Sequence, residues 1–212
     1  MIEITPSIIP KTREELETGI KRYESVVERV HLDILDGGFT LGKTVLGYDE
    51  LQSIETKLKF DVHLMVTHPE EYVPQWLKIA NADRFVIHVE SAGSLEEVFL
   101  EIRNQGKKVA IALNPETPVG SVMEYLPLVD YVHFLTVHPG SYGRPFLNDI
   151  IDKIFEFHDT HPETPIAVDG GINPETIHRV VDAGATIIVS GSYIMNAPDV
   201  AKAIAELKDG FK

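Results

Sequence analysis

Cysteine is absent from the 212-residue chain, and basic residues are scarce. The absence of cysteine excludes disulfides and thiolate chemistry, and it fits a protein of the reducing cytoplasm. The 19 Lys and Arg residues are outnumbered by 33 Asp and Glu residues, so the formal net charge is -14. Such a surface repels nucleic acid and anionic lipid, and we expect neither as a partner. It also repels anionic substrates, so any anion site must be built locally from backbone N–H groups or a metal ion.

Long apolar runs are also lacking. No run approaches the roughly 20 residues that span a bilayer, and residues 1–7 lack the basic start and apolar core of a signal peptide. We therefore expect no membrane segment and a cytoplasmic location. The hydrophobic content of 43% is ordinary for a globular protein with a full core. The length fits one large domain or two small ones.

Strand-like and helix-like segments alternate along the whole chain. Some helix starts are marked locally, because Thr12 with Glu15 three residues later resembles a capping box and Pro69 suits a first helical turn. We predict strands at 3–9, 29–34, 60–65, 84–89, 108–113, 131–136, 165–168 and 187–190, and helices at 12–23, 48–57, 69–79, 95–105, 119–126, 148–159, 174–183 and 198–207.

These segments make eight βα units at a spacing of roughly 26 residues, which indicates a parallel sheet. Neither a long linker nor a break in composition separates them, and this favours a closed (β/α)8 barrel, or TIM barrel, as one domain over residues 1–212. The alternative is an open doubly wound sheet. In a barrel, chemistry lies where the strands end and the βα loops begin.

Strand 29–34 carries a polar pair for which packing alone gives little reason. Side chains two apart in a strand point to the same face. His31 and Asp33 therefore share one face, while the other face carries Val30, Leu32 and Ile34. A buried carboxylate must be paired, hydrogen-bonded or bound to a metal ion. This pair is the first indication of a functional site.

Two further side chains at strand ends extend the pair. His63 falls at the end of the third strand, next to the second strand in the ring, and Asp169 ends the seventh. Two imidazoles and two carboxylates suit a borderline divalent ion such as zinc, iron, manganese or cobalt. The alternative is that each is a separately hydrogen-bonded core residue. Their convergence on one barrel mouth favours a metal site made by His31, Asp33, His63 and Asp169.

Other polar residues also collect at the predicted strand ends. We interpret His88 and Glu90 as supports of the site rather than as direct ligands. The remaining members of this group are Ser7, Asn114, Thr136, His138, Ser190 and Ser192.

Glycine-rich turns follow the last three strands. Residues 140–143 follow the sixth strand, Gly170 and Gly171 the seventh, and Gly191 with Ser192 the eighth. Glycine lets backbone N–H groups approach an anion closely, and the last two loops are the usual phosphate site of a barrel. One such pair would indicate only a tight turn, but three in adjacent loops predict a phosphate site.

Asp33 and Asp169 come from strands two and seven, which lie three positions apart around a ring of eight. They can therefore flank a small ligand from different sides. One carboxylate would remove a proton from a carbon beside a carbonyl, and the other would return a proton to the opposite face. A metal ion would stabilise the enediolate formed from an α-hydroxyketone. The predicted chemistry is epimerisation.

The order of these motifs resembles the ribulose-phosphate 3-epimerase family over nearly the whole chain. The resemblance implies a phosphate-binding (β/α)8 barrel with one divalent metal ion. Members of the family interconvert D-ribulose 5-phosphate and D-xylulose 5-phosphate in the pentose phosphate pathway and the Calvin cycle. The motifs are residues 6–9 (PSII), 31–37 (HLDILDG), 61–66 (DVHLMV), 112–118 (ALNPETP), 137–140 (VHPG), 168–173 (VDGGIN) and 190–192 (SGS).

Carried over position by position, the resemblance implies a role for each residue. Asp33 would accept the proton and Asp169 would donate it, with the roles exchanged in the reverse direction. The ion would be held by His31, Asp33, His63 and Asp169, and the sugar would be contacted by Ser7 and His63. The family commonly forms dimers or hexamers, so a homo-oligomer is also implied. The phosphate and nearby oxygens would be held by Gly140, Ser141, Tyr142, Gly143, Gly170, Gly171, Gly191 and Ser192.

The chain also departs from the family pattern. Residues 38–43 replace the usual His-Phe-Val-Pro-Asn stretch, and Arg144 stands where the family has Gln. Leu35 and Leu135 replace methionines that typically pad the site, whereas Met65 remains. These changes bear on the substrate, and D-allulose 6-phosphate is the alternative to D-ribulose 5-phosphate. A non-catalytic sugar-phosphate-binding barrel is a third hypothesis, which the presence of both carboxylates disfavours.

Overall fold

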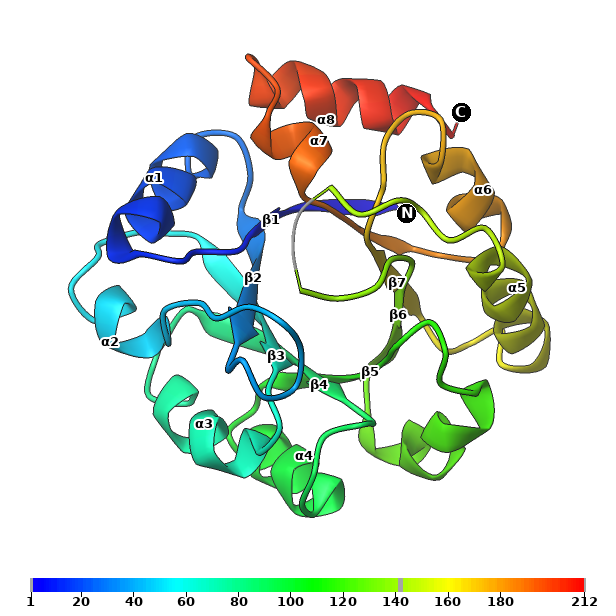
Figure 1. The fold of residues 1–212 in the computed structure, drawn as a ribbon, viewed down its shortest axis with the longest axis horizontal. Coiled ribbons are helices and arrows are strands. Elements are labelled where there is room, and N and C mark those ends of the chain that lie inside the picture. Colours follow the sequence, from blue (N-terminus) through cyan, green and yellow to red (C-terminus); the bar gives the residue numbers. More distant parts are fainter. Residues whose placement is uncertain (1, 141–142, 212) are drawn as a thin grey trace.

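The computed structural model describes residues 2–140 and 143–211, and its strands close into a parallel barrel in chain order (Figure 1). β2 pairs with β3 so that Asp33 lies opposite His63, and β1 closes the ring against β8. The closed barrel is confirmed, and the open sheet is excluded. The strands are β1 (Glu3–Ile8), β2 (Arg29–Leu35), β3 (Lys59–Met65), β4 (Ala82–His88), β5 (Lys108–Leu113), β6 (Tyr131–Leu135), β7 (Ile166–Asp169) and β8 (Ile187–Ser190).

The helices lie outside the ring of strands (Figure 1). Thr12 caps the first of them by accepting a hydrogen bond from the N–H of Glu15, as predicted. The Glu15 carboxylate accepts from the N–H of Lys11, one residue earlier than a capping box requires. The helices are α1 (Arg13–Tyr23), α2 (Tyr48–Leu51), α3 (Pro69–Trp76), α4 (Leu95–Asn104), the 3-10 helix η1 (Val119–Leu128), α5 (Ile150–Thr160), α6 (Ile177–Asp182), α7 (Ser192–Met195) and α8 (Val200–Asp209).

The predicted and observed helices differ most at three places. The helix predicted over 48–57 stops at Leu51, where the chain tightens into a three-residue turn and the Ser53 hydroxyl donates to the Glu50 carbonyl. The segment 119–126 is part of a 3-10 helix, and Pro127 within it has no N–H to donate. Helix α7 was not predicted, because four residues are too few for a helical pattern.

Both faces of the central strands are buried, as parallel strands under helices require. On β2, Val30, Leu32 and Ile34 are fully buried in the layer between strands and helices, and His31 and Asp33 are 1% and 2% exposed. The predicted division of this strand into two faces is confirmed. Burying each outward aliphatic side chain stabilises the fold by roughly 2 kcal/mol, and this fixes the register that holds the polar pair.

An ion-pair network closes the amino-terminal end of the barrel. Arg84 binds both carboxylate oxygens of Glu3 at 2.9 Å, and Arg29 contacts the buried carboxylate of Asp61 at 2.5 Å and that of Asp83 at 2.5 Å. Burial raises the pKa of Asp61, and the nearby charges of Arg29 and Arg84 offset only part of that increase. The opposite end of the barrel is the one that carries the polar residues predicted from the strand ends. No helix in the described part of the chain is long and apolar enough to cross a membrane.

Candidate metal centre and phosphate pocket

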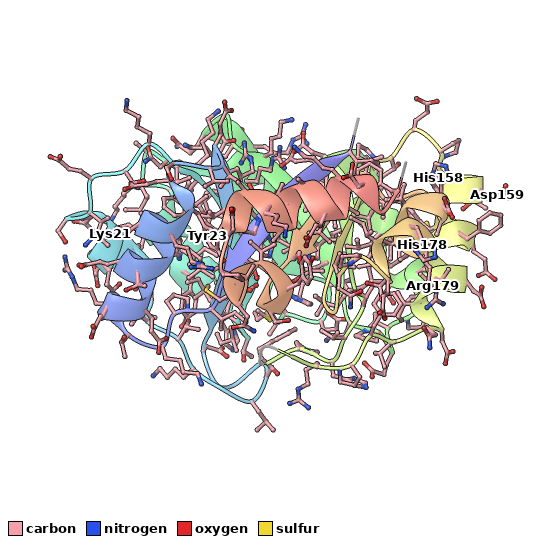
Figure 2. All side chains as sticks on the ribbon, turned by 90° about the horizontal axis from the view of Figure 1, so that it is seen from above. Lys21, Tyr23, His158, Asp159, His178 and Arg179 are labelled. Carbon is pink, nitrogen blue, oxygen red and sulfur yellow. The ribbon has the colours of Figure 1, made fainter. Side chains whose placement is uncertain are left out.

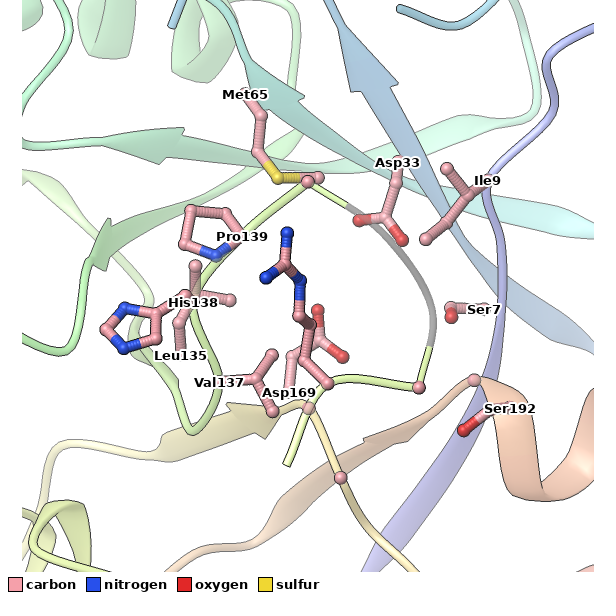
Figure 3. Close-up of a pocket in the computed structure, with 16 residues that line it drawn as sticks. Ser7, Ile9, Asp33, Met65, Leu135, Val137, His138, Pro139, Asp169 and Ser192 are labelled. Atoms are coloured by element: carbon pink, nitrogen blue, oxygen red, sulfur yellow. The ribbon is translucent and has the colours of Figure 1, made fainter. Parts of the chain in front are cut away.

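The carboxyl ends of the strands open into a pocket that is ringed by βα loops (Figure 3). Figure 3 shows the carboxylates of Asp33 and Asp169 reaching into it from different sides. The pocket brings together most of the predicted site residues. Those that line it are Ser7, Asp33, Gly140, Gly143, Asp169, Gly170, Gly171, Gly191 and Ser192, and the others include Met65, Leu135 and Arg144.

Asp33 is held by two imidazoles. Its Oδ1 lies 2.8 Å from Nδ1 of His63 and 3.4 Å from Nε2 of His31. Burial alone would raise the pKa of Asp33, but the contacts with these two rings outweigh it and lower the pKa to about 2. Asp33 is therefore ionised at neutral pH and can accept a proton.

Asp169 has the opposite electrostatic environment. Burial and the nearby charge of Asp33 raise the pKa of Asp169 to about 7, and His31 offsets only part of the increase. Two carboxyl groups whose environments push their pKa values apart can serve as base and acid in one site. Asp169 is the member that holds a proton near neutral pH.

Thr136 fixes the backbone that carries Asp169. Its N–H donates to the Asp169 carbonyl at 2.8 Å, and its hydroxyl contacts the carbonyl oxygens of Asp169 and Gly170 at 2.9 and 2.5 Å. Thr136 is buried and contacts the backbone rather than the pocket. It orients the carboxyl at the end of β7.

A chain of hydrogen bonds leads from Asp33 to the rim of the barrel. His63 Nε2 lies 2.9 Å from His88 Nε2, and His88 Nδ1 lies 3.1 Å from the Glu90 carboxylate. The other oxygen of Glu90 accepts from the N–H of Asn114 at 2.8 Å and from the hydroxyl of Thr117. Such partners fix the tautomer and orientation of a functional imidazole. The geometry supports the interpretation of His88 and Glu90 as supports of the site.

His133 on β6 is a residue that the sequence analysis missed. Its ring is fully buried, and neither of its nitrogens has a hydrogen-bond partner among the described residues. It stacks on His31, with ring centroids 5.3 Å apart and planes 11° from parallel. The signal was the alternation of β6, which turns His133 inward between Tyr131 and Leu135. His133 lies two residues before the end of β6, as His63 does in β3, but β6 carries no second histidine or carboxylate beside it.

Four donor atoms, from His31, His63, His133 and Asp169, lie within 4.8 Å of one another. Leaving a buried nitrogen without a hydrogen bond costs about 1–3 kcal/mol, and both nitrogens of His133 are in that state among the described residues, while His31 Nε2 has only its 3.4 Å contact with Asp33. Nitrogen and carboxylate donors suit the predicted class of ions, zinc, iron, manganese or cobalt. Asp33 lies outside this group but contacts two of its members. The residues therefore fit a divalent ion.

Glycine is required in the phosphate-site loops by backbone geometry. Gly170 has φ +117°, and a Cβ there would lie 2.4 Å from Val137. Gly171 has φ +65°, and a Cβ there would lie 3.0 Å from Phe146. Helix α7 begins at Ser192, so the free N–H groups of its first turn lie at the pocket rim. Ser141 and Tyr142, which were predicted to bind the phosphate, lie outside the described residues.

The loop after β2 contacts the loop after β6, which lines the pocket. Asp36 anchors it by accepting from the N–H groups of Gly38 at 2.7 Å, Phe39 at 2.8 Å and Thr67 at 2.7 Å. The Thr40 hydroxyl donates to the carbonyl of Pro139 at 3.2 Å, which joins this loop to the loop after β6. Residues 38–43, which depart from the family pattern, thus join the loop after β2 to the loop after β6.

Comparisons with known proteins agree with this geometry. The model of the family described as "Ribulose-phosphate 3 epimerase family" matches residues 3–195. A ribulose-phosphate 3-epimerase of Synechocystis is 36% identical over 98% of this chain and 94% of its own length, and one of Bacillus subtilis is 35% identical over 98% and 99%. A 3-hexulose-6-phosphate synthase structure from Salmonella typhimurium has a TM-score of 0.74 at 15% identity, covering 99% of this chain and 98% of that one. That likeness shows the fold alone.

Proposed function

The chain belongs to the ribulose-phosphate 3-epimerase family, and from this premise we propose that it epimerises C3 of D-ribulose 5-phosphate to give D-xylulose 5-phosphate. The observation that carries the mechanism is the pair of opposed carboxyls in one pocket. Asp33 has a pKa lowered to about 2, and Asp169 has one raised to about 7. A two-base epimerisation needs one ionised and one protonated carboxyl at the start of each turnover.

In the forward direction, Asp33 accepts the proton from C3. Its hydrogen bond from His63 and its contact with His31 keep the carboxylate ionised and aimed into the pocket. The carbon skeleton that has lost this proton is a planar enediolate. A planar intermediate can be protonated on either face, so the stereochemical outcome depends on which acid reaches it.

Asp169 delivers a proton to the opposite face. It enters the pocket from a different side than Asp33, and its carboxyl carries a proton near neutral pH (Figure 3). After turnover Asp33 is protonated and Asp169 is ionised, which is the starting state for the reverse reaction. The two groups then return to their first state through exchange with solvent.

A divalent ion would be held by His31, His63 and Asp169, which belong to the group of donor atoms described above, and Asp33 would lie beside the ion. When bound, such an ion supplies positive charge that stabilises the negative oxygens of the deprotonated substrate. The chain's own part is to orient its donors. Asp33 and the chain through His88 and Glu90 hold His63, while Thr136 holds the backbone of Asp169.

The substrate phosphate is assigned to the loops after β6, β7 and β8. Their glycines expose backbone N–H groups, and this local site answers the repulsion expected from a net charge of -14. The side chain of Ser192 adds a hydroxyl at the same rim (Figure 3). The phosphate therefore fixes the far end of the sugar, and C3 lies between the two carboxyls.

The test is an epimerase assay of metal-stripped protein with zinc, iron, manganese and cobalt added back singly. We expect no turnover without an ion, and a kcat/KM at least about tenfold higher for D-ribulose 5-phosphate than for D-allulose 6-phosphate. A preference for D-allulose 6-phosphate would move the assignment to that substrate. Phosphate binding without turnover of either sugar would support a non-catalytic barrel instead.

Family membership supports two further expectations, a place in the pentose phosphate pathway and a dimeric or hexameric assembly. The expected cytoplasmic location rests instead on the absence of cysteine. Light scattering of the purified chain tests the assembly, and a monomer would contradict it.

A further inference from the structure

We propose that His133 is a metal ligand, so that the centre of this chain presents a third imidazole beside His31 and His63. This ligand role deepens the proposed function and rests on its divalent ion. It concerns one residue of β6 that no predicted role includes.

The surroundings of His133 leave it no other partner of the right chemistry. Its ladder neighbours are Ala112 on β5 and Ala167 on β7, which have no side-chain polar atoms. The side chain is fully buried, and both nitrogens lack a hydrogen bond among the described residues. A core imidazole normally donates or accepts at least one hydrogen bond. A buried imidazole that makes no hydrogen bond and lies beside other donor atoms is available to bind a metal ion.

The direction of the ring supports the same role. His133 Nε2 lies 4.0 Å from Oδ2 of Asp169, and His31 Nε2 lies 4.0 Å from the same oxygen. Donors bound to one ion at 2.1 Å in a tetrahedron lie about 3.4 Å apart. Both imidazole nitrogens are about 0.6 Å farther from Asp169 than that, and all donor atoms of the group lie within 4.8 Å of one another, so movements of the side chains alone bring the three atoms onto one ion. The stacking of His133 on His31 keeps the two rings side by side during these movements.

His63 needs a rearrangement that His133 does not. Both nitrogens of His63 are engaged, with Asp33 and with His88. Binding an ion through His63 exchanges one of these hydrogen bonds for a metal bond, whereas His133 gives up nothing. His133 can therefore bind an ion without losing a hydrogen bond.

A third imidazole changes which ions the site prefers. Nitrogen donors favour zinc, cobalt and iron over magnesium and manganese, which prefer oxygen donors. If an apolar residue replaces His133, the site loses one nitrogen donor. Its preference for zinc, cobalt and iron over magnesium and manganese should then become smaller.

The direct test is NMR of the wild-type protein labelled with 15N-histidine and loaded with 113Cd²⁺. We expect one-bond 113Cd–15N couplings to three imidazoles, one of them assigned to His133 by its loss in the His133→Leu variant. Couplings to only two imidazoles in the wild-type protein would overturn the ligand role, and this outcome does not depend on the variant folding.

A second test measures affinity for Co²⁺ and Zn²⁺ by competition with a chromophoric chelator. His133→Leu should weaken binding at least about tenfold and change the visible spectrum of the Co²⁺ form. The matched control is Tyr131→Phe, which removes a polar group from another inward, buried position of β6 and should leave both unchanged. Equal affinity and an unchanged spectrum in a folded His133→Leu variant would contradict the ligand role.

Failure of this inference is separable from failure of the proposed function. A protein that epimerises ribulose 5-phosphate with only two bound imidazoles refutes the role of His133 alone. A protein with three bound imidazoles and no epimerase activity refutes the function alone.

Discussion

Two aspartates at the barrel mouth acquire opposite properties from their neighbours. Contacts with His31 and His63 outweigh burial and lower the pKa of Asp33 to about 2, whereas burial and the charge of Asp33 raise the pKa of Asp169 to about 7. The chemistry of the site thus follows from which groups the ring of strands places beside each carboxyl. A single residue type serves as acid and as base.

The raised pKa of Asp169 predicts a pH-dependent stability in the metal-free protein. A folded pKa of about 7, above the ordinary 3.8, contributes stability that is fully present below about pH 4 and is lost as the pH rises through 7. Asn is neutral at every pH, so Asp169→Asn should be more stable than the wild type at about pH 8, by up to about 4 kcal/mol. The difference should vanish near pH 4. Urea unfolding of the chelator-treated proteins measures it.

The control for this measurement is Asp159→Asn. Asp159 is an exposed carboxyl at the end of α5, on the outside of the molecule (Figure 2). Its replacement should leave the stability curve parallel to that of the wild type. A difference between Asp169→Asn and the wild type that is the same at all pH values would contradict the raised pKa.

At the scale of single residues, strand alternation predicted that His31 and Asp33 of β2 share a face, because side chains two apart in a strand point to the same side. His63 and Asp169 were also found, because Asp169 ends β7 and His63 lies two residues before the end of β3, beside Asp33 of β2. His133 was missed because a single histidine within an apolar strand is indistinguishable in sequence from a hydrogen-bonded core residue. Only the assembled ring shows that its neighbours on β5 and β7 are Ala112 and Ala167.

At the scale of elements, the loop after β2 depends on close backbone contact with the loop after β6. A Cβ on Gly140 would lie 2.7 Å from the carbonyl oxygen of Leu41 and 3.0 Å from the hydroxyl of Thr40. Gly140 also has φ +119°, which side chains rarely adopt. The two loops can therefore bridge the pocket only with glycine at this position.

Gly140→Ala should separate the two loops and weaken substrate binding. We expect KM for D-ribulose 5-phosphate to rise about tenfold, together with a stability loss of roughly 1–2 kcal/mol from backbone strain. The matched variant is Gly106→Ala, which has φ +70° but open space around the Cβ. It should show a loss of stability without a change in KM. Steady-state kinetics and urea unfolding measure both, and equal KM values in the two variants would refute the bridge.

Element boundaries show where local sequence rules fail. Strand 108–113 was predicted to the residue, because KVAIAL is apolar and is bounded by a glycine and a breaker. The helix over 48–57 was too long, because its pattern does not reveal the competition of the Ser53 hydroxyl for the Glu50 carbonyl. The missed helix α7 has only the four residues after Gly191, and its place is set by the barrel rather than by its own periodicity.

At the scale of the whole molecule, the contacts that stabilise the barrel lie at one end of its axis and the pocket lies at the other. The amino-terminal end holds the ion-pair network of Glu3, Arg29, Asp61 and Arg84, and the carboxyl-terminal end holds the pocket. Count and regularity of βα units predicted the closed ring. They do not predict this network, because long-range pairs such as Glu3 with Arg84 exist only once the ring has closed.

Arg84→Met should destabilise the protein by about 1–3 kcal/mol, because half-buried Glu3 loses its bidentate partner and buried Asp61 keeps only Arg29. The kcat/KM should stay within about twofold of the wild type, since the pocket is at the other end. The control is Arg13→Met, which removes an exposed i,i+4 pair with Glu17 and should cost less than about 1 kcal/mol. Urea unfolding with parallel kinetics tests this, and a large loss of kcat/KM in folded Arg84→Met would contradict the separation.

The central claim is that two carboxyls on opposite sides of the pocket perform the proton transfers. The most direct measurement is a single turnover of D-ribulose 5-phosphate in deuterium oxide by the metal-loaded enzyme, with the product analysed by NMR at its earliest appearance. If Asp33 removes the proton and Asp169 returns another, the D-xylulose 5-phosphate carries deuterium at C3 from the first molecules formed. Product that retains the original C3 proton would mean that one group transfers the same proton to both faces, and it would contradict the two-carboxyl mechanism.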